Sequence, residues 1–385
     1  MTIWIALPAA ALCVSMFYYA AATLAAIRFA KRTVSPLPPL PKVPPRVAVL
    51  KPLHGSSNSL ASNLVSFLEI AYPRVEFYFG VESYEDAAAE IPVALRQRYQ
   101  YANITLMIGE EPNCSNRKIA KLVKMADRAE KAEVFVLSDA DVSVDRDYLK
   151  RIVGELMSDE KVGIVTCAYR ARPGGSFASR LEALYVNTDF LPQILLAEMI
   201  EPMHYALGAT IAIKRKVLEA AGGFRAVKNM LADDFYLGNF VNTQGYEIKL
   251  SDAIVTLTCE EKNFADFWHH QLRWARTYRT VRPISLATIL MHGPFWALVL
   301  LAVTRGSAAA FAALVLVVAA RLAMSAAIVG RVLKMPEMLG DLWLVPFKDL
   351  IMTGVWFGSL LSNKVMWAGR RFKVIRGGAM REVKS

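Results

Sequence analysis

The sequence predicts an α/β domain of the doubly wound kind, placed between apolar helices at its two ends. Short β-rich runs alternate with amphipathic stretches between residues 46 and 284, at the spacing of strand–helix–strand units. Long runs without charge flank this region on both sides. Ligands of such sheets bind beyond the carboxyl ends of the strands, so candidate residues are sought there.

Composition supports this division of the chain. Of its 385 residues, 55% are hydrophobic and 21% are charged, and the mean hydropathy is positive. The chain is therefore too apolar for an ordinary soluble enzyme and too charged for a wholly embedded protein. A net charge of +11 suits nucleic acid, anionic lipid or phosphorylated substrates. We expect no nucleic-acid partner, because no module that binds nucleic acid is recognisable.

The N-terminal segment predicts a membrane anchor. Ile3 to Ile27 carries no charge over about 25 residues, enough to cross ~30 Å of hydrocarbon. A signal peptide is the alternative, but this run is too long, lacks a basic start and has its charges after it. Those charges place its C-terminal end in the cytosol. The proline-rich segment that follows predicts a stiff, extended linker.

Within the α/β region the expected elements alternate. The runs that predict strands are Val47–Leu50, Val75–Val81, Ile104–Ile108, Val134–Ser138, Val162–Ala168 and Thr210–Lys214. The stretches that predict helices are Leu60–Ile70, Ala87–Gln100 and Lys118–Ala129. The pair Gly222-Gly223 is expected to end a later helix.

The C-terminal part returns to apolar sequence. Ser285–Thr304 and Ala308–Val329 predict two membrane spans, although Arg321 lies in the second. Leu342–Leu361 is interrupted by a lysine–aspartate pair, and a third span would place the basic tail outside, against the charge rule. We therefore expect an interfacial or re-entrant segment there.

Five parts result from these assignments. They are an anchor (1–30), a linker (31–45), a catalytic domain (46–284), C-terminal membrane segments (285–363) and a basic cytosolic tail (364–385). Basic residues beside the apolar runs are explained by topology and by an anionic membrane surface. They are Arg28, Lys31, Arg32, Lys364, Arg370, Arg371, Lys373 and Arg376.

Two carboxylates follow the apolar run Val134–Ser138. Such a run is typical of a central strand buried on both faces, and it ends at Asp139 and Asp141, where ligands meet a sheet. Carboxylate oxygens are what Mg²⁺ or Mn²⁺ requires when it bridges a diphosphate. The alternative is a turn in which aspartate caps the end of the strand.

A second acidic pair, Asp233-Asp234, lies in an apolar setting. Transfer to a hydroxyl needs a base, and a sheltered carboxylate gains basicity, so Asp234 is the candidate. The alternative is that one of the pair caps a helix over Phe235–Gly245.

The third motif lies between Phe267 and Arg276. Arg273 offers a planar set of donors that suits a diphosphate leaving group, and Trp274 suits an apolar floor for the acceptor. Adjacent histidines point apart on a helix, so His269 and His270 are poorly placed to share a metal ion. The alternative is an amphipathic helix on the membrane surface, which applies to Trp268, Arg276, Arg279 and Arg282.

The order of these motifs resembles inverting glycosyltransferases of the GT-A fold, and more narrowly the ceramide glucosyltransferase family. Within it, the chain is most similar to bacterial glycosyltransferases of hopanoid biosynthesis. The similarity extends from Arg46 to Arg282, and more weakly to Gly378. Its motifs are Val49-Leu50-Lys51-Pro52-Leu53-His54-Gly55, Asn63-Leu64, Tyr72-Pro73, Asn116-x-Lys118-Ile119, Ala221-Gly222-Gly223-Phe224 and Asp233-Asp234-Phe235.

The resemblance implies a Rossmann-like GT-A domain in the cytosol, with transmembrane helices at both ends. It implies that Asp139 and Asp141 hold metal and nucleotide and that Asp234 is the base. Lys118 matches a lysine near the diphosphate, while Arg273 and Trp274 match the end of a (Gln/Arg)-x-x-Arg-Trp motif.

Two positions depart from the family pattern. His270 stands where the motif has Gln or Arg, which weakens its assignment to the nucleotide-sugar. Ser83 stands where the family has an aspartate that contacts the nucleoside, and the neighbouring Glu82 is the candidate substitute.

The implied reaction moves N-acetylglucosamine or glucose from a UDP-sugar onto a membrane lipid hydroxyl in one inverting displacement. The resemblance favours a hopanoid such as bacteriohopanetetrol, and an integral protein of the bacterial inner membrane with its catalytic domain in the cytosol. Ceramide or diacylglycerol as acceptor, a processive polysaccharide synthase, and a catalytically silent membrane scaffold are the alternatives.

Overall fold

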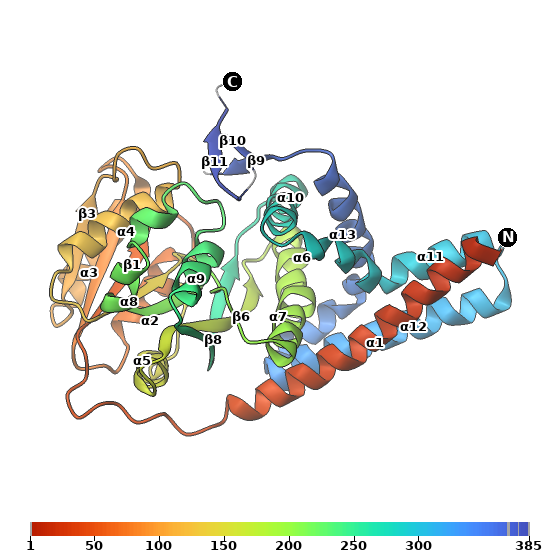
Figure 1. The fold of residues 1–385 in the computed structure, drawn as a ribbon, viewed down its shortest axis with the longest axis horizontal. Coiled ribbons are helices and arrows are strands. Elements are labelled where there is room, and N and C mark those ends of the chain that lie inside the picture. Colours follow the sequence, from red (N-terminus) through yellow and green to blue (C-terminus); the bar gives the residue numbers. More distant parts are fainter. Residues whose placement is uncertain (1, 368–369, 376, 384–385) are drawn as a thin grey trace.

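A computed structural model of the chain describes residues 2–367, 370–375 and 377–383. An eight-stranded sheet forms the centre of the α/β domain, in the order β3-β2-β1-β4-β7-β6-β8-β5 (Figure 1). The strands are β1 (Val47–Pro52), β2 (Val75–Val81), β3 (Ile104–Ile108), β4 (Val134–Ser138), β5 (Val142–Ser143), β6 (Val162–Pro173), β7 (Thr210–Lys214) and β8 (Glu247–Cys259).

Helices connect and cover these strands, which confirms the predicted α/β class. They are α2 (Leu60–Leu68), α3 (Glu90–Arg98), α4 (Arg117–Arg128), α5 (Tyr148–Met157), α6 (Phe177–Tyr185), α7 (Leu191–Ile200), α8 (Arg215–Ala220), α9 (Asp233–Thr243) and α10 (Phe264–Val281). The strands expected at 75–81, 104–108 and 134–138 form with those bounds.

The sheet is parallel in its first half and mixed in its second. Strands β3, β2, β1 and β4 pair in parallel, whereas β7 runs antiparallel to both β4 and β6. The antiparallel direction of β7 follows from the position at which this strand begins. The backbone N–H of Asp139 donates to Ala209 at 3.3 Å, so β7 begins beside the carboxyl end of β4 and must run back along it.

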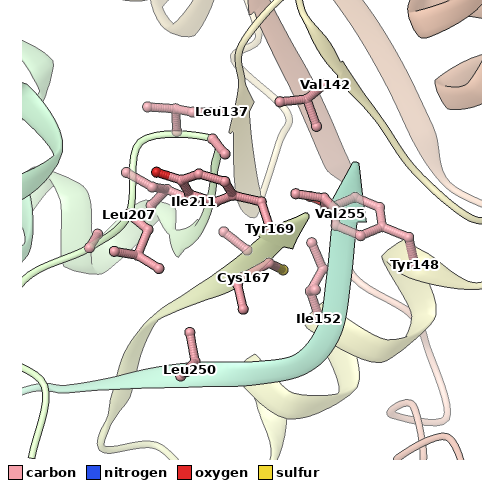
Figure 2. Close-up of a cluster of buried hydrophobic side chains, with 14 of the residues drawn as sticks. Leu137, Val142, Tyr148, Ile152, Cys167, Tyr169, Leu207, Ile211, Leu250 and Val255 are labelled. Atoms are coloured by element: carbon pink, nitrogen blue, oxygen red, sulfur yellow. The ribbon is translucent and has the colours of Figure 1, made fainter. Parts of the chain in front are cut away.

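The core beneath the site joins both halves of the sheet. Figure 2 shows side chains of β4, β6, β7 and β8 meeting those of α5, among them Leu137, Ile152 and Ile211. All three are at most 2% exposed. Burying each such side chain stabilises the fold by about 1.5–3 kcal/mol. The end of β4 is therefore a rigid support for the residues that follow it.

Within the described residues, two helices are long and apolar enough to cross a membrane. They are α1 (Thr2–Arg32), which qualifies over Ile3–Arg32, and α12 (Ala308–Ala326), which η5 (Ala327–Val332) extends. In Figure 1 they lie side by side. The first matches the expected anchor. The second matches the span expected at Ala308–Val329.

The span expected at Ser285–Thr304 is bent. A 3₁₀ helix, η4 (Pro283–Met291), and α11 (Gly293–Val303) meet at an angle of 61°. They would make a third crossing by length and composition if they count as one span. The bend lies directly before Pro294, which cannot donate a backbone hydrogen bond to the preceding turn. Gly293 beside it allows close packing on α1, since a Cβ there would lie 2.6 Å from the Tyr19 hydroxyl.

Charged residues in the apolar segments pair with one another. Arg321 of α12 contacts Asp349 of α13 (Val345–Leu360) at 2.8 Å and Asp189 at 2.9 Å. Lys348 pairs with the same two carboxylates. The lysine–aspartate pair in the last apolar run is therefore neutralised by Arg321 and Asp189 inside the helix bundle. The helix that carries the pair, α13, is only 16 residues long.

Asp349→Asn is expected to lower the free energy of unfolding by about 3–5 kcal/mol, because it leaves buried cations short of one counter-charge. Thermal unfolding in detergent would measure this. Glu219→Gln, which weakens the exposed pair with Arg215, should change the stability by less than about 0.5 kcal/mol. Equal shifts for the two variants would contradict the prediction.

The segment expected as a basic tail folds against the α/β domain. It forms a three-stranded sheet of β9 (Lys364–Trp367), β10 (Arg370–Val374) and β11 (Met380–Glu382), which Figure 1 shows beside α10. Leu231, two residues before the second acidic pair, donates its N–H to Gly378 at 3.1 Å. Arg376, counted among the basic residues, lies outside the described residues.

Candidate active site

A cavity of about 670 Å³ opens at the carboxyl end of β4. Its lining includes most of the predicted site residues and continues among the apolar helices. From the predicted set the lining residues are Lys118, Asp139, Asp141, Asp234, His270, Arg273 and Trp274. Glu82 is the predicted residue that does not line it. The structure therefore brings seven of the eight predicted residues to one space.

Asp139 and Asp141 lie where β4 ends. Asp141 is exposed to the cavity. The mass of protein around the cavity and the charge of Asp139 raise its pKa to about 7. Both carboxylates line the same cavity. They are a donor set that suits a hard divalent ion.

Two lysines support this pair. Lys118, near the start of α4, places its Nζ 2.6 Å from Asp139 and 3.7 Å from Asp233. Lys51, at the end of β1, is fully buried and donates to the backbone oxygens of Asp139 at 2.8 Å and Val142 at 3.3 Å. Burial lowers the pKa of Lys51 to about 7 despite the two nearby carboxylates. Lys51 therefore positions the turn that carries both aspartates.

Asp234 faces the cavity from the first turn of α9. The helix begins at Asp233, two residues earlier than expected, and Ala232 occupies the cap, so neither aspartate is the capping residue. Burial and the neighbouring Asp233 raise the pKa of Asp234 to about 7. Gly208 leaves it room, since a Cβ there would lie 2.8 Å from Asp234 Oδ2.

Asp233 has a different, internal environment. It accepts a hydrogen bond of 3.1 Å from Asn116, which also donates to Met230 at 2.9 Å and accepts from Ile119 at 3.1 Å. One asparagine thus caps α4 and ties it to the approach to α9. As a result the Asn116 side chain fixes the positions of Lys118 and Asp234 relative to each other.

Arg273 and Trp274 project from α10. The guanidinium of Arg273 forms no ion pair or hydrogen bond with a residue that the structure describes, and burial lowers its pKa. Trp274 lies within 6.0 Å, ring centre to ring centre, of Tyr185 and Phe190. One face of α10 therefore presents a cation and an aromatic surface to the cavity.

Other side chains on α10 and at its C-terminal end contact protein. Arg276 donates to Lys364 at 2.6 Å, Arg279 donates to Ser362 at 3.2 Å, and Arg282 pairs with Glu201 at 2.8 Å. A Cβ at Gly354 of α13 would lie 3.4 Å from the Trp268 ring. These contacts join α10 to α13, to β9 and to the end of α7. Trp268, Arg276, Arg279 and Arg282 thus contact protein, so their presence in α10 and at its end does not require that α10 lie on the membrane surface.

His270 lies between two carboxylates that sequence reasoning missed. Its Nδ1 is 3.0 Å from Glu182 of α6 and 3.3 Å from Glu261. Burial alone would lower the pKa of His270, but the two carboxylates outweigh it and raise the pKa to about 9. His269, by contrast, is exposed. His270 therefore carries a positive charge at neutral pH and connects α10 to α6.

The raised pKa of His270 predicts that its contribution to the stability of the fold is lost at high pH. The ion pairs contribute fully below the ordinary pKa of 6.5, and the contribution disappears as pH rises through about 9. The difference in unfolding temperature between the native chain and His270→Gln should therefore be larger at pH 6 than at pH 10. The matched variant His269→Gln should show no such trend, and a constant His270 effect across that range would exclude the charged pair.

Glu82 lies apart from the other predicted residues. Its carboxylate pairs with Arg117, which also contacts Glu110 at 3.1 Å. The pair is near the start of α4, one residue from Lys118. In this arrangement Glu82 can orient α4.

The chain is also similar to known proteins. The model of the family described as glycosyl transferase family 21 matches residues 7–380, nearly the whole chain. The chain belongs to glycosyl transferase family 21. The match extends beyond the α/β domain to both apolar parts and to most of the C-terminal sheet.

Curated relatives of this family 21 chain are distant. Ceramide glucosyltransferase 3 of Caenorhabditis elegans is 25% identical over 65% of the chain and 53% of its own length. Probable glycosyltransferase YdaM of Bacillus subtilis is 25% identical over 60% and 55%. The chain thus spans about half the length of the curated relatives it matches.

A solved structure extends the comparison to the fold. A mannosyltransferase from Pyrobaculum calidifontis, solved with GDP-mannose and Mn²⁺, aligns with a TM-score of 0.53 at 20% identity, over 92% of this family 21 chain and 99% of its own. At that identity the likeness shows the fold alone. It confirms the predicted GT-A class.

Proposed function

We propose that the chain is an inverting glycosyltransferase that moves N-acetylglucosamine or glucose from a UDP-sugar onto a membrane lipid hydroxyl. One observation carries the proposal. The cavity that holds Asp139, Asp141 and Asp234 continues to Tyr18 of α1 and Met291 of η4. A water-soluble donor and a lipid acceptor can therefore meet without either leaving its own phase.

The donor end of the cavity suits a nucleoside diphosphate. Asp139 and Asp141 would hold Mg²⁺ or Mn²⁺, which when bound would neutralise charge on the diphosphate. Lys118 lies beside Asp139, and the planar donors of Arg273 have no partner among the residues that the structure describes. Arginine in that state binds phosphate oxygens through two parallel hydrogen bonds.

His270 and Glu82 act on the donor indirectly, through the helices that they hold in place. His270 lines the same cavity, and its Nδ1 side is occupied by Glu182 and Glu261. Glu82 reaches the donor region through Arg117 and α4. We assign both to the nucleotide-sugar site, with His270 holding α10 in place and Glu82 orienting α4.

Asp234 has the properties of a general base. A pKa of about 7 lets it accept a proton at neutral pH and still ionise in part of the population. In the proposed step the lipid oxygen forms a bond to the anomeric carbon as the bond to UDP breaks, and Asp234 takes the hydroxyl proton. Attack from the side opposite the leaving group inverts the anomeric configuration.

The apolar helices supply the setting for the acceptor. We place the chain in the bacterial inner membrane with the α/β domain in the cytosol, because basic residues follow α1 and anionic headgroups attract them. Among acceptors we favour a hopanoid such as bacteriohopanetetrol. The relatives named ceramide glucosyltransferase keep ceramide as a second choice.

Mass spectrometry of products tests the proposal. The full chain in lipid nanodiscs is incubated with UDP-N-acetylglucosamine or UDP-glucose, Mn²⁺ and a panel of hopanoid, ceramide and diacylglycerol acceptors. One sugar on one lipid, with the β configuration from an α-linked donor, is the expected product. A polymer would identify a polysaccharide synthase, and no metal-dependent UDP release with any acceptor would identify a silent scaffold.

A further inference from the structure

The cavity has a second end, which the proposed reaction does not use. Beyond the carboxylates its lining includes polar side chains that lie among apolar helices: Tyr18 of α1, Asp189, Gln193 of α7, and His292 at the bend between η4 and α11. In Figure 1, α7 lies against the end of α1 that is nearer the sheet. These residues come from three separated parts of the chain.

Tyr18 gives the clearest sign that this end binds something. Its side chain is only 6% exposed, and its hydroxyl has no hydrogen-bond partner among the residues that the structure describes. A buried hydroxyl without a partner costs about 1–3 kcal/mol. The neighbouring Tyr19 shows the usual arrangement, since its hydroxyl donates to Met291 and accepts from Gly293 at 3.2 Å.

Two of the other polar groups also have hydrogen-bond donors or acceptors that are unused within the described part of the chain. The Gln193 amide forms no hydrogen bond within the part of the chain that the structure describes. His292 uses Nδ1 for Thr353 at 2.7 Å, which leaves its other ring nitrogen free to bond. Asp189 is different, because Arg321 and Lys348 already pair with it. Tyr18, Gln193 and His292 therefore provide donors and acceptors for a ligand.

The apolar part of a ligand has its own route. Ile200, at the end of α7, and Ile284, in η4, both line the cavity and are each 73% exposed. Large apolar side chains at the mouth of a cavity, beside helices able to cross a membrane, suit a hydrocarbon chain that extends into the bilayer. A hydrocarbon placed at Tyr18 instead would leave three polar groups without water or partners.

We propose that Tyr18, Gln193 and His292 form an acceptor subsite that binds a second polar group of the lipid, a hydroxyl or an amide, beyond the hydroxyl that reacts. The acceptor class is then a lipid with several polar groups in its head, and a lipid alcohol with a single hydroxyl is a poor substrate. This inference rests on the proposed transfer to a lipid.

A matched pair of acceptors tests the subsite. The full chain in nanodiscs is assayed with UDP-N-acetylglucosamine or UDP-glucose, whichever is the better donor, and with a long-chain 1,2,3,4-tetrol or the primary alkanol of equal chain length. The native chain should have a kcat/KM at least tenfold higher for the tetrol. Tyr18→Phe with Gln193→Leu should lower kcat/KM for the tetrol about tenfold and leave the alkanol within twofold.

Two controls separate the possible failures. Tyr19→Phe, whose hydroxyl serves the backbone, should change both acceptors alike, and UDP binding should be unchanged in every variant. Equal rates for the two acceptors in the native chain, or equal losses in the double variant, would overturn the subsite and leave lipid transfer intact. Transfer to neither acceptor, with UDP still bound, would instead refute the proposed function.

Discussion

Asp234→Asn should lower sugar transfer by about 10²–10⁴-fold, the range for losing a general base, while UDP-sugar binding changes little. Asparagine keeps the shape and can still accept the backbone N–H of Phe235, which Asp234 Oδ1 accepts at 2.8 Å. It cannot take a proton from the acceptor hydroxyl. Turnover by mass spectrometry and donor affinity by calorimetry would measure the two effects separately.

The pH profile provides a second readout for Asp234. Burial and Asp233 raise its pKa to about 7, and only the ionised form accepts a proton, so the transfer rate should rise with pH up to about 7 and then level off. Asp145→Asn, an exposed aspartate outside the cavity, is the matched control. Near-native turnover in Asp234→Asn would remove Asp234 from the role of base.

The first half of the sheet could be predicted because its sequence signals are local. Val75–Val81 and Val134–Ser138 are short apolar runs between polar stretches, and burial on both faces requires that pattern. The position of Asp139 and Asp141 then follows from the rule that ligands bind beyond the carboxyl ends of strands. The order of the three motifs along the chain then supplied the family resemblance.

Other features depend on contacts between distant residues, which no local pattern encodes. In the sequence alone, Arg321 is an unfavourable charge within an apolar segment. Only the structure shows that Asp189 and Asp349 pair with it. Glu182 lies 88 positions before His270 and has no motif of its own. The sheet β9–β11 likewise depends on packing against other elements.

Lys51 combines both situations: the residue was notable in the sequence, but its role depends on contacts with distant residues. A lysine inside the otherwise apolar β1 was visible in the sequence, and it stood in a family motif without a role. Only the structure shows its Nζ 2.8 Å from the backbone oxygen of Asp139 and 3.7 Å from the Phe67 ring centre. A charged residue in a strand that is buried along its whole length is therefore the signal that could have identified it.

Asp139→Asn is expected to have the other large effect, a fall in transfer of about 10²–10³-fold, the scale for losing one charge contact to a developing leaving group. The variant removes one anionic ligand from the pair with Asp141 and one partner from Lys118, which lies 2.6 Å away. Both changes act on the diphosphate end of the cavity. Donor affinity should therefore fall together with turnover, unlike in Asp234→Asn.

Chelation should reproduce this loss in the native chain, because EDTA withdraws the divalent ion that the two carboxylates would hold. Calorimetric titration of Mn²⁺ in the presence of UDP should show binding to the native chain and to Asp145→Asn, and weak or no binding to Asp139→Asn. Since Lys118 and Lys51 remain in the variant, an anion could still enter the cavity. A variant that keeps both full Mn²⁺ binding and full turnover would show that the carboxylates at the end of β4 serve only to shape the turn.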